Sequence, residues 1–501
     1  VLQYPLEQDV LFPLASIGTL SHFAPNAALL FGLCLALLLI FYLSAYAALR
    51  RAASSSEGLS ERAAQVIIIF PVLAMLILAH LYPITSLDSI NQDIQIRVLT
   101  AHHANPLITP ASAFSSDPFT TYDDRQNFSS PYGPLWVLLS AGPALLAGNN
   151  LLALALLEKM IPIVFALGCL RVIWLIATKV APYRRWQALL LIGWNPLVLL
   201  ETAGNGHNES IMLFFVLLSF YSLISNSRWR WFTLPALALA ALVNSAALIF
   251  LPLLAVALWR MASPTRRLVT TLGNSGGAAL LLVAALIPFG GVRAVHSLLQ
   301  PLDQFALSLP AMLYRFLQPL YNEAQAAAIV KALAVICFGL WYLLILYRLI
   351  RRNSLQPIND KNLSANTLVI AGYEVVFWFF TLAALAFQPW MILWLIPFAA
   401  LDARLMPLVR ATILTAGGLF VPLILIFIAH GALVSGALNL FTVQLIAVLL
   451  LFVPVLFVRF IEAIYQRRRL VAALAAREAE LARLQRELHI TSEANISRAP
   501  E

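Results

Sequence analysis

The chain has 501 residues, of which 61% are hydrophobic and only 11% are charged. Soluble globular proteins are about half apolar and a quarter charged, so this composition excludes a soluble globular protein. The net charge of +9 does not require a nucleic-acid partner, because a membrane protein gathers Lys and Arg in its cytoplasmic loops.

Apolar runs of about 20 residues recur along the whole chain, and each is long enough to cross a bilayer as a helix. They predict an all-α, polytopic membrane protein whose membrane domain covers 25–460. The segment 1–24 is polar enough to lie outside the lipid, and no cleavable signal peptide is expected. About eleven full crossings are expected near residues 25–49, 65–83, 151–178, 186–203, 208–226, 268–290, 325–350, 366–386, 389–406, 409–430 and 436–459.

Two further apolar runs are short or interrupted. The run 132–147 contains two Gly-Pro pairs. The run 231–258 has arginines at both ends, so a single crossing would violate the charge rule, and Asn244 and Pro252 interrupt it. Both runs are expected to be re-entrant or broken helices, which gives about 11–13 membrane segments in all.

The arginine distribution predicts the orientation of the chain. Basic residues follow the crossings at 25–49, 151–178 and 208–226, so these ends are expected in the cytoplasm. The alternate connections then lie outside. They are the first outer loop at 84–131, the turn at 204–208, the second outer loop at 291–323, and Gln388.

The C-terminal segment 461–489 is expected to be a cytoplasmic helix. Its leucines follow a three- and four-residue spacing that is typical of an amphipathic or coiled-coil helix, at Leu470, Leu474, Leu481, Leu484 and Leu488. Such a helix would pack on a protein partner or a second copy, or alternatively lie on the membrane surface. Residues 490–501 are expected to be disordered.

Polar side chains gather in the outer connections. They are Asp88, Asp93, Arg97, His102, His103 and Asn105 in the first loop; Glu201, Asn205, His207, Asn208 and Glu209 around the turn; and Arg293, Arg315, Gln388 and Trp390 further on. Some have ordinary structural interpretations. Asp88 could be solvated, His207 could cap a helix, Arg97 could snorkel, and Trp390 could belong to an aromatic belt. Glu201 lies just inside a span, where an ionisable group is a functional candidate by default.

No metal site is indicated. His102 and His103 are adjacent, so their side chains point apart on a helix, and no third ligand is evident. The three cysteines, Cys34, Cys169 and Cys337, lie in apolar runs and are expected to be buried small hydrophobes. No cofactor is expected, although the sequence leaves a divalent metal open.

A lipid-linked sugar phosphate would use all of these outer groups. Its lipid tail needs a groove between spans, and its phosphate needs fixed cations, for which Arg97, Arg293 and Arg315 are available. A carboxylate can act as the base for an attacking hydroxyl. The remaining Asn, His, Glu and Gln side chains, with Asp93, would bind sugar hydroxyls.

Four sequence stretches resemble a known family. They are SLD followed nine residues later by Arg97 and then an Asn-Pro, YGPLW, WNPLVLLETAGNGHNE, and QPWMILWLIP. Together they resemble the GT-C superfamily of integral-membrane glycosyltransferases, closest to bacterial polyprenyl-phosphate-mannose-dependent alpha-mannosyltransferases. The resemblance covers roughly 84–210 and 366–400. It departs at Glu209, because the family's motif is His-Asn-Asp and has aspartate at this position, and at Asn244, where a lysine is expected.

The resemblance implies a GT-C fold in a bacterial inner or plasma membrane, with its site at the outer surface. It implies that Asp88 is the general base and that basic residues near that surface contact the donor phosphate. The favoured hypothesis is an inverting transferase that moves one sugar, mannose by resemblance, from a polyprenyl phosphate to a lipid-linked glycan or other acceptor. The alternatives are a non-catalytic GT-C subunit of a larger complex and a flippase or transporter of lipid-linked sugars.

Overall fold

The computed structural model describes residues 25–496 except 53–58, 84, 87, 118, 121–124, 226–227, 300–303, 355–360, 426–435 and 437–438. The expected outer segment 1–24 therefore lies outside the described residues. Of the residues that the structure describes, 82% are helical and none lies in a strand. An isolated bridge pairs Ala306 with Ala386. The expected all-α architecture is confirmed.

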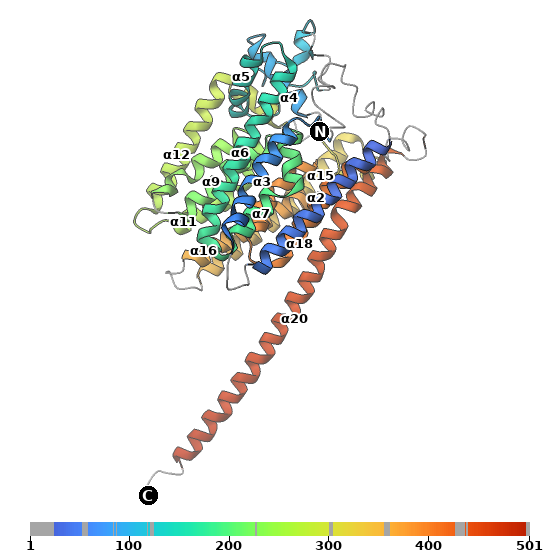
Figure 1. Cartoon of the computed structure of the whole chain (residues 1–501). Helices are drawn as coiled ribbons and strands as arrows, with labels where there is room; N and C mark the ends of the chain where they lie inside the picture. The colour runs from blue at the N-terminus through green and yellow to red at the C-terminus, as the bar shows by residue number, and fades with distance from the viewer. Residues whose placement is uncertain are drawn as a thin grey trace. The chain divides into compact units, whose positions relative to one another are not determined.

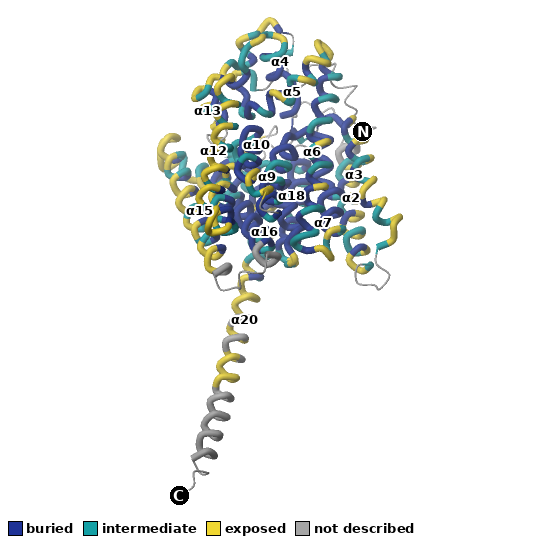
Figure 2. The backbone as a smooth tube through the Cα atoms, turned by 90° about the vertical axis from the view of Figure 1, so that its left-hand side faces the viewer, coloured by how far each residue is buried: buried dark blue, intermediate teal, exposed yellow. Residues whose placement is uncertain are grey.

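Eight helices in the described part are long and apolar enough to cross a membrane, which confirms a polytopic membrane protein. The exposed share differs between them, as Figure 2 shows. Only 11% of the most apolar stretch of α12 is buried, against 67% in α16, so α12 is peripheral and α16 is central. The long helices are α2 (Pro25–Ala52), α3 (Glu61–Ala79), α6 (Leu151–Val180), α12 (Arg267–Leu286), α15 (Glu323–Ser354), α16 (Lys361–Trp378), α18 (Leu405–Leu423) and α20 (Leu440–Ile496) (Figure 1).

Three expected crossings are built from shorter helices, so the described residues hold fewer full spans than the 11–13 segments predicted. The stretch from Pro196 to Gly204 and the helix after it are bent by 119° and together make at most a ninth span. Pro196, Pro389 and Pro397 each stand in the first turn of a new short helix, because proline lacks the N–H that a continuing helix needs. The pieces are α7 (Arg185–Gly193), α8 (Pro196–Leu199), η5 (Leu200–Gly204), α9 (Glu209–Ile224), η11 (Pro389–Trp394) and α17 (Ile396–Leu401).

The run 231–258 is broken, as the sequence predicts. It forms α10 (Thr233–Ala241), η7 (Ser245–Phe250) and α11 (Leu251–Met261). Asn244 stands at the break, and its side chain accepts a hydrogen bond from the Ala246 N–H at 3.1 Å, so it acts as the N-cap of η7.

The start of α5 (Pro134–Ala147) fits into this break. The Gly133 N–H donates to the Val243 carbonyl at 3.0 Å, and the Leu135 N–H donates to the Leu242 carbonyl at 3.0 Å. A Cβ on Gly133 would lie 2.2 Å from the Leu242 carbonyl oxygen. The close approach of the two backbones therefore requires glycine at this position of the YGPLW motif.

The loop predicted to lie outside at 291–323 contains two short helices, α13 (Val292–Leu299) and α14 (Leu309–Leu317). Between them, the Phe387 N–H donates to the Ala306 carbonyl at 2.8 Å, and Ser308 Oγ donates to the Leu385 carbonyl at 2.7 Å. These bonds fix the segment that leads into Gln388 and η11.

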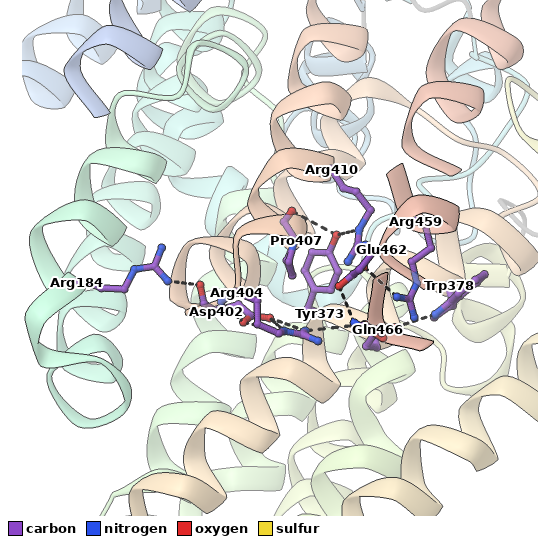
Figure 3. A network of polar contacts seen from close by, with 11 residues as sticks. Arg184, Tyr373, Trp378, Asp402, Arg404, Pro407, Arg410, Arg459, Glu462 and Gln466 are labelled. Carbon is purple, nitrogen blue, oxygen red and sulfur yellow. Dashed lines mark hydrogen bonds and ion pairs between the residues drawn. The ribbon is translucent and has the colours of Figure 1, made fainter. Parts of the chain in front are cut away.

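A polar network joins the ends of α16, α17 and α18 (Figure 3). The buried Asp402 carboxylate accepts from Arg404 Nη2 at 2.6 Å, and the Asp402 carbonyl accepts from Arg184 Nη1 at 2.5 Å. Arg410 is fully buried and donates from Nε to the Tyr373 hydroxyl at 2.9 Å. The charges that these helix ends bury are thus held by hydrogen bonds.

Residues Phe452–Glu501 form a second compact unit, most of it the last part of α20. Within this unit, Glu462 accepts from Arg459 at 2.9 Å and from Gln466 at 3.1 Å, as neighbours one helical turn apart (Figure 3). The helix is continuous through 461–489 and runs to Ile496, into the segment predicted to be disordered. Of the leucine stripe, Leu481 is 53% exposed, and the other four side chains lie outside the described part.

Candidate functional site

The polar helix α4 (Asp88–Thr100), in the loop 84–131, is buried along most of its length. Every residue from Asp88 to Val98 is buried, although five of these eleven residues are Asp, Asn or Gln. Buried polar groups cost free energy unless they have partners, so α4 is not a solvated surface helix. Asp88 itself is only 9% exposed, and its N–H donates to Ser86 Oγ at 3.1 Å where the helix begins. A carboxylate in this first turn is also favoured by the helix dipole.

The turn 205–208 lies directly against the first turn of α4. Gly206 has a positive φ of +74°, which favours glycine. A Cβ at this position would lie 3.3 Å from the Cβ of Ser89 and 3.1 Å from Cγ of Lys159. The structure therefore brings the residue after Asp88 into contact with the GNGHNE turn, although the two segments are far apart in sequence.

A π-helix leads into the turn. In η5, the Asn205 N–H donates to the Leu200 carbonyl at 2.8 Å, and the His207 N–H then donates to the Glu201 carbonyl at 3.0 Å. The Asn205 amide also donates to the Glu201 carboxylate at 2.8 Å and to the hydroxyl of Thr85, just before α4. Single π turns occur frequently at functional sites. A second one, η10 (Phe379–Ala383), comes shortly before Gln388.

His207 is the centre of the turn. Its Nε2 lies 3.3 Å from Glu201 Oε2, and its Nδ1 lies 3.9 Å from Glu209 Oε2. Its ring stacks on Trp390, with 4.0 Å between the ring centroids. Asn208 is fully buried, and neither its amide oxygen nor its amide nitrogen has a hydrogen-bond partner among the residues that the structure describes. One cluster thus contains Glu201, His207, Asn208, Glu209 and Trp390, all of them predicted from the sequence, and we call it the acceptor cluster.

Asp88 faces an arginine that sequence reasoning missed. Arg125 Nη2 lies 3.6 Å from Asp88 Oδ1, and the arginine side chain is 35% exposed. The charge of Asp88 also acts on Tyr132. Burial first, and then the negative charges of Asp88 and Glu209, raise the pKa of its phenol well above the usual range, so Tyr132 stays protonated at neutral pH.

A second buried cluster lies beneath α4. Lys159, in α6, is 2% exposed, and its Nζ donates to the carbonyls of Ala79 at 3.2 Å, Leu81 at 2.5 Å and Gly204 at 2.7 Å. Next to it, Glu158 accepts from Ser140 Oγ at 3.1 Å.

Asp93 belongs to this cluster rather than to the surface of the loop. It is 1% exposed. Burial first, and then the charge of Glu158, raise the pKa of Asp93 well above its usual value, while the charge of Lys159 opposes them. Asp93 is enclosed beneath α4, whereas Asp88 lies beside Arg125 and next to the residue that contacts the turn 205–208, which makes Asp88 the better candidate for a base.

Arg97 lies at the other end of α4, about 13 Å from Asp88 at the rise of an α-helix. Its guanidinium donates to Asp117 Oδ2 at 3.1 and 3.2 Å, to Asn149 Oδ1 at 3.2 Å and to the Gly148 carbonyl at 3.1 Å. This arginine is therefore a buried, fixed cation and does not snorkel.

Asp117 also joins the loop to His102, whose Nε2 lies 2.9 Å from the same carboxylate oxygen. Burial raises the pKa of Asp117, but the hydrogen bonds from the Phe119 N–H and His102 and the charge of Arg97 together hold it below its usual value. His102 of the 102–103 pair is therefore engaged by this carboxylate. Among the described residues, no group of three or more His, Cys, Asp and Glu side chains is arranged to hold a metal ion.

The remaining predicted residues lie on other elements. Asn105 has a structural position, because its amide donates to the Phe289 carbonyl at 2.6 Å and its oxygen accepts from the Leu107 N–H at 3.0 Å. Arg293 lies on α13, and Arg315 lies on α14, where it donates to Gln318 at 3.3 Å. Gln388 stands directly before η11.

Four residues of the site were not predicted from the sequence: Arg125, Tyr132, Glu158 and Lys159. A signal existed for the last two. They are adjacent ionisable residues inside the apolar run 151–178, and such residues mark functional sites by default. Tyr132 begins the YGPLW motif, but nothing in the spacing singles out Arg125.

Comparison with known proteins gives one match. The family model described as alpha-(1->6)-mannopyranosyltransferase, N-terminal domain, matches residues 8–260 of this chain. The matched region contains α4, Lys159, the turn 205–208 and the break at Asn244. No curated protein matches the chain.

Proposed function

The chain belongs to the alpha-(1->6)-mannopyranosyltransferase family, and on this premise we propose that it transfers one mannose from a polyprenyl-phosphate donor with inversion at the anomeric carbon. The acceptor is a lipid-linked glycan or another hydroxyl-bearing molecule. The reaction takes place on the outer face of a bacterial inner or plasma membrane. Membership of the family supports mannosyltransferase activity at a membrane. The identity of the donor, the inversion at the anomeric carbon and the side of the membrane are our proposals.

One observation carries the proposal: Asp88 lies at the start of a buried polar helix, beside a turn of hydrogen-bonding side chains. Ser89 contacts Gly206, and the acceptor cluster extends from there to Trp390. The base and the groups that hold sugar hydroxyls thus share one location. A solvated loop acid would not need such surroundings.

The proposed step is a single displacement. The Asp88 carboxylate removes the proton from the acceptor hydroxyl as its oxygen attacks the anomeric carbon. The bond from that carbon to the phosphate oxygen breaks, and the polyprenyl phosphate leaves with the electron pair. One displacement inverts the configuration, so an alpha product requires a beta-linked mannosyl phosphate.

The other residues bind and orient. Arg125 forms an ion pair with the Asp88 carboxylate and fixes its direction. Arg97 is a fixed guanidinium about 13 Å further along α4, which suits the phosphate end of a bound sugar phosphate. Arg293 and Arg315 are proposed as further contacts of the donor. The acceptor cluster, with Gln388, is proposed to surround the sugars, whereas Asp93 and Asn105 are proposed to support the site through their buried and backbone contacts.

The same premise gives the expected topology. We propose that the first loop, the turn 205–208, α13 and α14 face the outside, whereas Lys179 and the C-terminal helix lie in the cytoplasm. The segment 461–489 is proposed to bind a protein partner or a second copy. No nucleic acid and no cofactor enter the proposal.

A non-catalytic subunit is the second candidate. Two observations favour it, namely Glu209 in place of the family's aspartate and Asn244 serving as a helix cap where a lysine is expected. A flippase remains the third candidate, because the helix bent by 119° is a device that transporters also use.

The deciding experiment measures transfer from radiolabelled polyprenyl-phosphate mannose by the purified full-length protein in liposomes. Asp88→Asn keeps the shape but removes the proton acceptor, so transfer should fall by roughly 100- to 10,000-fold. Asp93→Asn is the matched control on the same helix and should retain much more activity. The opposite ranking would assign the base to Asp93. Translocation without transfer would favour the flippase, and an inactive parent protein would favour the subunit.

A further inference from the structure

We propose that Lys159 is a positioning residue that sets the distance between Asp88 and the acceptor cluster. It does not touch the reacting atoms. Its ammonium instead joins the ends of the two segments that carry the two halves of the site. The inference rests on the proposed function, because it concerns the base and the acceptor side of that same reaction.

The contacts of Lys159 match its chemistry. An ammonium has three N–H donors, and Nζ meets three carbonyls, those of Ala79, Leu81 and Gly204. Ala79 is the last residue of α3, and Gly204 is the last residue of η5. Carbonyls at helix C-termini lack partners within the helix and carry partial negative charge, so a buried cation satisfies both ends at once.

Short connections carry this restraint to the site. Asp88, the first residue of α4, comes shortly after Leu81 in the chain, and Asn205 directly follows Gly204. The methylene stem of Lys159 also supports the turn, because its Cγ would lie 3.1 Å from a Cβ on Gly206. The lysine thus contacts the segment that leads into α4, the end of η5, and the turn itself.

Two acids lie near Lys159. Glu158 precedes it in α6, and Asp93, whose pKa the charge of Lys159 lowers, lies on α4, one and a half turns after Asp88. Because α4 packs on α6, the helix that carries Lys159 also supports the helix that carries Asp88. A lone buried ammonium would be strongly unfavourable, so the residues around Lys159 form a built site for this cation.

The test compares Lys159→Arg with Lys159→Met, and Lys179→Met serves as a control in the last turn of the same helix. Arginine keeps the charge, but its planar fork cannot direct three donors at three convergent carbonyls. A shift of about 1 Å in a reacting group can lower the rate by about 100-fold. We therefore expect kcat of Lys159→Arg to fall by about 10- to 100-fold per folded molecule, with KM for the donor unchanged.

A merely structural lysine would behave differently. It would lower the folded fraction and leave the rate of each folded molecule intact, and that result would overturn the inference. A positioning residue acts through Asp88, so adding Lys159→Arg to Asp88→Asn should cause no further loss of transfer. If the losses of transfer rate caused by Lys159→Arg and Asp88→Asn multiplied in the double variant, that result would also overturn the proposal.

Hydrogen exchange gives a readout that does not depend on activity. In Lys159→Met, the amides of 80–88 and 200–208 should exchange faster together, while those around Lys179 stay protected. Unchanged exchange in either segment would contradict the inference. If the parent protein transfers no mannose but both segments loosen, the proposed function fails and the restraint by Lys159 stands.

Discussion

The imidazole of His207 lies against the indole of Trp390, with 4.0 Å between the ring centroids and 22° between the ring planes. The two residues come from the two sequence blocks GNGHNE and QPW, which lie in different halves of the chain. The stack shows that Trp390 has a partner inside the protein, so an aromatic-belt position does not describe it. It also fixes one ring nitrogen of His207 toward Glu201.

Replacing Trp390 by alanine should therefore impair the acceptor cluster. Stacked aromatic pairs contribute about 1 kcal/mol beyond the apolar area that they bury, so we expect a modest loss of stability and a clear rise in KM for the acceptor. Trp390→Phe keeps a ring and should retain most of the affinity. Thermal unfolding and transfer kinetics of both variants check this, and an unchanged KM in Trp390→Ala would contradict it.

Arg125→Gln should lower kcat by about 10-fold, because a base that loses its orienting partner spends less time in the productive geometry. Arg125→Lys restores a positive charge and should recover part of the rate. The partly exposed side chain predicts little effect on the melting temperature. Equal activity in the glutamine variant and the parent protein would show that Asp88 is oriented by other contacts.

Arg97→Gln should destabilise the protein by about 3 kcal/mol, because it leaves the buried Asp117 carboxylate without its main partner. The double variant Arg97→Gln/Asp117→Asn removes both charges and should recover part of that loss. Denaturation of the two variants in detergent measures the difference. A loss of donor binding that the double variant does not restore would support the phosphate contact proposed for Arg97.

Acid should weaken the first loop through Asp117. The folded state holds the pKa of this carboxyl below its usual value, so its contribution to stability is complete above about pH 4. The contribution is lost as the pH falls through the lowered folded-state value. Melting temperatures measured from pH 6 to pH 3 should therefore fall less steeply in Asp117→Asn than in the parent protein, and parallel curves would contradict this assignment.

Two glycines near or within α5 provide a matched pair. Gly133→Ala would place a Cβ 2.2 Å from the Leu242 carbonyl oxygen, whereas nothing lies within 4 Å of a Cβ on Gly142. Gly133→Ala should separate α5 from the break at Asn244 and lower the melting temperature. Gly142→Ala should raise stability by about 0.5–1 kcal/mol, since alanine favours the helix. Similar effects of both changes would mean that the close contact at Gly133 relaxes freely.

Much of the architecture could be predicted from local pattern. The apolar runs gave the long helices, and the arginines at both ends of 231–258 correctly predicted its break near Asn244. Within the described residues, the expected crossings 186–203 and 389–406 are apolar enough to span a membrane but are divided at prolines into shorter helices. Periodicity alone does not separate one long helix from two short ones.

The site was predictable only in part, for a physical reason. Asp88 and the GNGHNE turn carry recognisable residue types, whereas Arg125 becomes significant only because the fold places it 3.6 Å from Asp88. The burial of α4 was equally hidden, since a helix rich in Asp, Asn and Gln has the composition of an exposed loop. Only the helices packed around it turn its polar groups inward.

The enclosed polar helix α4 has a consequence for how the protein is made. Its own residues are too polar to enter lipid, and α5, α6 and the turn 205–208, which surround it, all come later in the chain. The segment can therefore reach its buried position only after more than a hundred further residues have been synthesised. The centre that carries Asp88 thus depends on elements made well after α4 itself.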